Sequence, residues 1–62
     1  MYTTIDTGQD VVFSYDYNGA DVTFGGKVLE VDKENDSFTL EMGGETDQLQ
    51  LSKITDVFMI SL

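Results

Sequence analysis

The sequence contains no cysteine and no histidine, and each absence excludes a class of chemistry. Without cysteine the chain forms no disulfide and offers no thiolate ligand to a metal. Without histidine it lacks the commonest general base and the commonest metal-binding side chain. The remaining residues show no nucleophile–base pair, metal-ligand cluster or phosphate-binding loop. We therefore expect a protein that is not an enzyme and that uses no cofactor and no metal.

Positive charge is also scarce. The chain has three lysines and no arginine against twelve aspartates and glutamates, which gives a formal net charge of −9. Direct binding to DNA or RNA is disfavoured, because contacts with phosphates need a cationic surface. The 40% hydrophobic content still allows a packed core, so the charge does not indicate disorder. The negative charge favours either plain solubility or attraction to a basic protein.

Long apolar runs are missing as well. No stretch approaches the roughly 20 residues of a membrane-spanning helix, and the polar, acidic start of the chain does not resemble a signal peptide. We expect a cytoplasmic protein without a membrane partner. The 62 residues form one domain, 1–62, with a single small core. Residues 10–62 are expected to form the folded barrel, and residues 1–9 either cap one end of it or are loose.

Apolar residues alternate with polar ones on both sides of Asn18-Gly19. This dipeptide is the strongest short-range indication of a two-residue hairpin turn. The turn places Asp16 directly opposite Asp21, where two carboxylates repel each other. The pair is interpreted either as two solvated side chains or as an acidic edge that faces a partner. The apolar face of this hairpin comprises Phe13, Tyr15, Tyr17, Ala20, Val22 and Phe24.

Period-two alternation continues through the rest of the chain. Gly25-Gly26 indicates a bulge or a sharp bend in the second strand. Ser52 is predicted to cap a short helical turn. The further predicted elements are strands at 27–31, 38–42, 46–51 and 56–62, turns at 32–37 and 43–44, and the helical turn at 52–55. Together they predict an all-β fold, a small, five-stranded, strongly bent SH3-like or Sm-like barrel with one short helical turn before the last strand.

Residues 24–40, "FGGKVLEVDKENDSFTL", resemble the first Sm motif. Asp36 stands where that family has an asparagine, and the Arg-Gly of the second Sm motif is missing from residues 54–60. In the Sm family the loop asparagine and this arginine bind RNA. The resemblance therefore implies the Sm-like fold but not the RNA binding. The matching positions are Gly26, Val28, Val31 and Asp32.

Residues 43–55, "GGETDQLQLSKIT", are similar to the Rof family of Rho-termination inhibitors, small acidic bacterial proteins with an Sm-like barrel. The resemblance implies a role in transcription termination, in which an acidic protein blocks a basic surface of a nucleic-acid-binding protein. The matching positions are Gly44, Glu45, Thr46, Leu49, Leu51, Lys53, Ile54 and Thr55.

The outward-facing carboxylates are the candidate partner-binding residues. A broad acidic surface can imitate the phosphate spacing of a nucleic acid and bind a basic groove quickly and in a salt-sensitive way. Asp32, Glu34 and Asp36 also have the spacing of the first three ligands of a calcium-binding loop. Ser37 stands where that loop needs a glycine, and Gly43 stands where it needs a glutamate, so an ordinary turn is favoured over a calcium site. The candidate residues are Asp16, Asp21, Asp32, Glu34, Asp36 and Glu41.

Two hypotheses follow for the function. The first is a non-enzymatic acidic module that inhibits a basic or nucleic-acid-binding protein by occluding its surface. A Rho-like termination factor is the target that the resemblance implies, and a host nuclease or defence protein is the alternative if the chain is phage-borne. The second is an Sm-like homo-oligomeric scaffold that assembles through edge strands.

Overall fold

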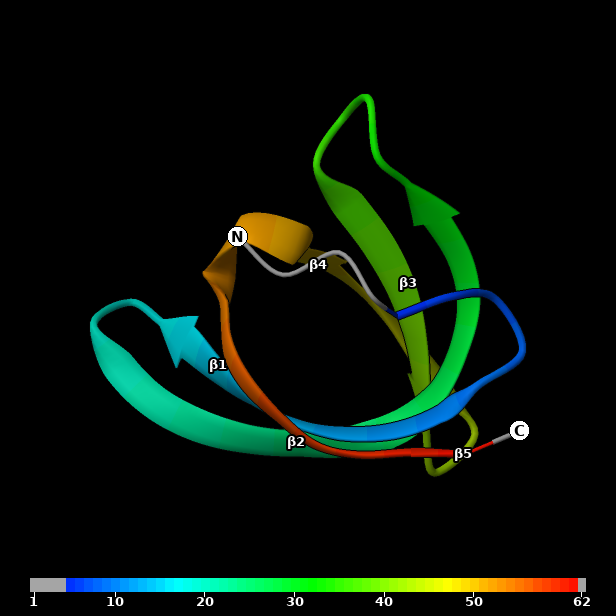
Figure 1. The fold of residues 1–62 in the computed structure, drawn as a ribbon, viewed down its shortest axis with the longest axis horizontal. Coiled ribbons are helices and arrows are strands. Elements are labelled where there is room, and N and C mark those ends of the chain that lie inside the picture. The colour runs from blue at the N-terminus through cyan, green and yellow to red at the C-terminus, as the bar shows by residue number, and fades with distance from the viewer. Residues whose placement is uncertain (1–4, 62) are drawn as a thin grey trace.

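The structure, a computed structural model, describes residues 5–61. Within this range five antiparallel strands form one sheet in the order β4-β3-β2-β1-β5. The predicted all-β fold with a helical turn before the last strand is confirmed. The sheet is strongly curved (Figure 1), and its buried apolar side chains form one core. The elements are β1 (Asp10–Tyr17), β2 (Ala20–Asp32), β3 (Ser37–Met42), β4 (Glu45–Gln50), the 3-10 helix η1 (Leu51–Lys53) and β5 (Ile54–Ser61).

The β1–β2 hairpin has the predicted turn and the predicted register. Asn18 and Gly19 take φ values of 54° and 86°, the left-handed conformation that a two-residue turn needs at both central positions. Asp16 lies opposite Asp21, as the sequence indicates. The turn chemistry and the alternation of apolar residues therefore specify the same pairing.

Of the two alternatives predicted for Gly25-Gly26, a bulge or a sharp bend, the bulge is not found. Both glycines pair in regular register with β1, and the irregularity lies three residues further on, where β2 pairs with β3. Leu29 is the extra residue there, and it is 40% exposed. The bulge explains why alternation along β2 breaks between Val28 and Val31, which both face the core.

The core contains aliphatic and aromatic side chains from every strand and from η1. Phe13 lies at its centre, with its ring 6.2, 6.0 and 5.7 Å from the rings of Tyr15, Phe24 and Phe38. The Tyr15 hydroxyl accepts a hydrogen bond of 2.9 Å from the Gln50 N–H, so β1 is tied to the end of β4. The buried core residues are Ile5, Val11, Phe13, Tyr15, Val28, Phe38, Leu40, Leu49, Leu51 and Ile54.

The segment before β1 is anchored to the sheet. Ile5 is 2% exposed and belongs to the core. The Gly8 N–H donates to the Val28 carbonyl, and the Val28 N–H donates to the Gln9 carbonyl, each at 2.8 Å. Residues 5–9 are therefore attached to the core and to β2, whereas residues 1–4 lie outside the described part of the chain.

The helical turn begins one residue earlier than predicted, and Ser52 is not its cap. The residue before η1 is Gln50, whose side chain makes no capping hydrogen bond. Ser52 instead donates its N–H to Asp36 Oδ1 at 2.9 Å and its hydroxyl to Asp36 Oδ2. These contacts tie η1 to the β2–β3 turn. Within residues 5–61, no helix has the length and hydropathy needed to cross a membrane.

Candidate functional site

Every carboxylate side chain of the protein lies at its surface. All twelve aspartates and glutamates belong to the described residues 5–61, and each is either exposed or half-buried. Only three lysines accompany them, at positions 27, 33 and 53. A surface of this composition carries a negative potential that attracts cations and basic proteins.

The structure distributes the predicted partner-binding carboxylates over separate regions. Asp16 and Asp21 belong to the β1–β2 hairpin, whose tip projects at the left of Figure 1. The β2–β3 turn, which carries Asp32, Glu34 and Asp36, projects at the top of the same view. Glu41 stands on β3 opposite Lys27 of β2, a cross-strand pair of opposite charge. The predicted set therefore does not form one continuous site.

Asp16 and Asp21 face each other, but each carboxylate has its own hydrogen-bond donors. Asp16 Oδ1 accepts from the Gly19 N–H at 2.9 Å, which closes the hairpin turn. Asp21 Oδ1 accepts from the Ser14 hydroxyl at 2.8 Å and from the Thr55 hydroxyl at 3.3 Å. These bonds offset the repulsion between the two carboxylates, and they connect β2 to β5 across β1.

A third carboxylate joins this pair on the outer face of the sheet. Asp56 of β5 lies opposite Ser14 of β1, the residue that donates to Asp21. We call Asp16, Asp21 and Asp56 the hairpin patch. Sequence reasoning missed Asp56, because simple alternation from the buried Ile54 would place it on the core side. A register shift between β5 and β1 reverses that parity.

The carboxylates of the β2–β3 turn stabilise the turn itself. Asp32 accepts hydrogen bonds from the Asn35 side chain at 2.7 Å and from its backbone N–H at 3.3 Å. These bonds from Asn35 lower the pKa of Asp32 below its ordinary value of 3.8. The ionised group therefore stabilises the fold above pH 3.8, and this contribution is lost as the pH falls through the lower folded pKa. Asp36 points to Ser52 instead, so the two carboxylates do not converge.

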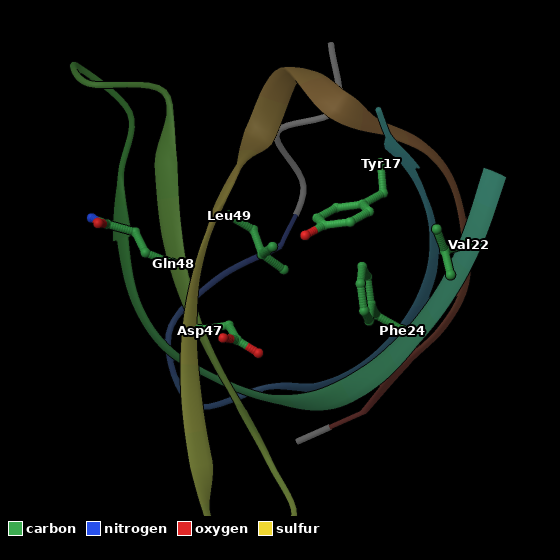
Figure 2. A pocket seen from close by; sticks show the side chains of 6 residues that line it. All are labelled: Tyr17, Val22, Phe24, Asp47, Gln48 and Leu49. Carbon is green, nitrogen blue, oxygen red and sulfur yellow. The ribbon is translucent and has the colours of Figure 1, made fainter. Parts of the chain in front are cut away.

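A groove of about 470 Å³ lies between the β1–β2 hairpin and β4. In Figure 2, Phe24 and Val22 line one wall, and the Tyr17 ring lies across the groove with its hydroxyl toward Leu49. Asp47 points from β4 toward the interior, whereas Gln48 points away. Sequence reasoning missed Asp47 as a candidate. The alternation in "TDQLQL" nevertheless places it on the same side of the strand as Leu49.

The outer edge of the sheet exposes apolar side chains. β5 is the last strand in the sheet order and pairs with β1 on one side. Phe58, Met59 and Ile60 are 59%, 49% and 39% exposed, while Val57 packs against the core. An edge strand with apolar side chains is a template for pairing with another chain.

Comparisons of the chain with protein-family models, with curated proteins and with solved structures find no match. Inferences about function therefore depend on the residues and on the geometry described above.

Proposed function

We propose that the protein is a non-enzymatic acidic module that binds a basic surface of a nucleic-acid-binding protein and inhibits that protein by occluding the surface. The observation that carries this proposal is the placement of all twelve carboxylates at the surface, with the hairpin patch contributed by three neighbouring strands. Interactions between exposed charges and a basic partner accelerate association and weaken as salt is added.

The proposal includes the barrel type and the class of target. The strand order β4-β3-β2-β1-β5, the long curved β2 and the helical turn before β5 support an SH3-like or Sm-like barrel. The similarity of residues 43–55 to the Rof family suggests a Rho-type termination factor as the target. A host nuclease or defence protein with a basic surface, opposed by a phage-borne inhibitor, is the other target class.

Affinity capture from the native host, followed by mass spectrometry at low and high salt, tests the proposal. The expected result is a nucleic-acid-binding protein that is retained at low salt and released at high salt. Neutralising two members of the hairpin patch by Asp16→Asn and Asp56→Asn should weaken its binding about tenfold. Asparagine keeps an oxygen that accepts the Gly19 N–H, so the turn is preserved.

The matched control is Glu30→Gln with Glu45→Gln, which removes the same charge from exposed positions outside the hairpin patch. We expect this control to weaken binding by less than about threefold. Equal losses of affinity in the two double variants would show that the hairpin patch contributes no more to binding than other surface carboxylates. Retention of the partner that does not depend on salt concentration would contradict the proposal that the acidic surface binds it.

A second candidate function is a homo-oligomeric scaffold assembled through edge strands. The exposed Phe58, Met59 and Ile60 on β5 favour it, because pairing of two β5 edges would cover apolar side chains and satisfy backbone groups. Sedimentation velocity separates the two functions. An oligomer that Phe58→Ser converts to monomer supports the scaffold, whereas a monomer at all concentrations of the unchanged protein excludes it.

A further inference from the structure

Asp47 occupies a position where the sheet carries core residues. In the β3–β4 register it lies opposite Leu40, and the next core-side pair is Phe38 with Leu49. Leu40 and Leu49 are buried, yet Asp47 is exposed, because the groove opens beside it. A carboxylate in a row of apolar residues is a local conflict with the pattern of the fold, and such conflicts are typical of binding sites.

The groove beside Asp47 has the size and composition of a ligand site. Its volume of about 470 Å³ lies in the range of roughly 300–1,000 Å³ that ligand pockets occupy. Tyr17, Val22, Phe24 and Leu49 supply apolar and aromatic surface, and Figure 2 shows the Asp47 carboxylate directed toward the same space. Tyr17 is 55% exposed, so its ring is accessible to an occupant of the groove.

The backbone of β4 offers hydrogen-bonding groups on the groove side. The Gln50 N–H donates to the Tyr15 hydroxyl on β1, which shows that it points away from β3. Residues two apart on an antiparallel strand direct their N–H and C=O groups to the same side. The main-chain groups of Gln48 therefore point toward the groove, and an extended segment of a partner can pair with them.

We propose that this groove binds an arginine or lysine side chain carried on an extended segment of a basic partner. The aliphatic stem packs on Phe24 and Leu49, the cationic head pairs with the Asp47 carboxylate, and the Tyr17 ring adds a cation–π contact. An apolar occupant would desolvate Asp47 without pairing it, and an acidic occupant would be repelled. The net charge of −9 favours the cationic occupant further. This inference rests on the proposed function, since it names the residue type by which the basic partner is anchored.

A titration of the protein with the peptide acetyl-Thr-Val-Arg-Val-Thr-amide, followed by ¹H–¹⁵N NMR, tests the groove directly. We expect the largest shift changes at Tyr17, Phe24 and Gln48. The same peptide with citrulline, a neutral analogue of arginine, should bind about tenfold more weakly, because it cannot form a charge-assisted hydrogen bond with Asp47. Shift changes spread evenly over the acidic surface, or none up to about 10 mM peptide, would overturn the proposal.

The decisive variant is Asp47→Asn, with Glu45→Gln as its matched control on the same strand. Asp47→Asn should weaken binding of the arginine peptide about tenfold, and Glu45→Gln by less than about twofold. Equal losses of peptide affinity in the two variants would show that binding depends on net charge alone, and would contradict the proposed arginine site in the groove.

The proposed function and the proposed groove site can be contradicted separately. A captured partner that binds Asp47→Asn as tightly as the unchanged protein contradicts the groove alone, whereas peptide binding without any capture of a basic partner contradicts the proposed function.

Discussion

Replacing Phe13 with alanine is expected to leave the protein largely unfolded at room temperature. The Phe13 side chain is fully buried, and its ring contacts the rings of Tyr15, Phe24 and Phe38. Truncating a buried phenylalanine costs about 3–5 kcal/mol, through lost burial and through the cavity that remains. A domain of this size has a free energy of unfolding of only about 3–5 kcal/mol, so the substitution removes most of it.

Circular dichroism and urea titration measure this effect. The Phe13→Ala protein should lose its near-ultraviolet signal and show no cooperative unfolding transition. The matched control is Phe58→Ala, because Phe58 is 59% exposed at the sheet edge and its truncation should change the stability by less than about 0.5 kcal/mol. A cooperative transition for Phe13→Ala near that of the control would contradict the described core.

The Gly26→Ala substitution should have the second largest effect, although it adds only one methyl group. A Cβ atom at Gly26 would overlap the Glu41 carbonyl oxygen and lie 3.0 Å from Met42 Cγ. The oxygen belongs to the backbone of β3, which pairs with β2 at Lys27 and Glu41, so it cannot move without disturbing the sheet. Overpacking of this kind costs about 1–3 kcal/mol or more, a large share of the stability of so small a domain.

Gly25→Ala provides the matched control one residue earlier. Its added Cβ atom would lie 3.4 Å from Val12 Cγ2 and 3.6 Å from the Val11 carbonyl oxygen, which are tolerable contacts. In urea titrations the midpoint should fall strongly for Gly26→Ala and change little for Gly25→Ala. Similar midpoints would show that β2 and β3 do not approach each other at Gly26 as closely as described.

The local patterns of the sequence were sufficient to predict most of the sheet. Asn18-Gly19 and Gly43-Gly44 both form the expected tight turns, with positive φ at each central residue. Such turns depend on residues adjacent in sequence, and a two-residue loop leaves one possible register. Alternation correctly predicted the buried Phe13 and Tyr15 of β1 and Phe38 and Leu40 of β3, since each side chain of a regular strand points opposite to its neighbours. Tyr17, predicted on the same apolar face, is 55% exposed beside the turn.

The sequence did not predict the positions at which the strands depart from regular alternation. The β2 bulge at Leu29 and the two register shifts between β1 and β5 depend on how distant strands pair. The second shift, between Ser14 and Tyr15, is what brings Asp56 to the outer face beside Asp21. Nothing local to residues 54–61 indicates these shifts, because they arise from the pairing of β5 with β1, which lies far away in the sequence.

The sequence alone determined the negative charge of the protein, which depends only on residue counts. It also determined that Asp16 faces Asp21, which depends on one tight turn. Only the tertiary structure decided which donors each carboxylate meets, with Asp21 bound to Ser14 and Thr55 and Asp36 bound to Ser52. It also decided that Asp47 borders an open groove, because the curvature of the sheet sets the distance between β4 and the β1–β2 hairpin. Such contacts join residues far apart in the chain, and no local pattern encodes them.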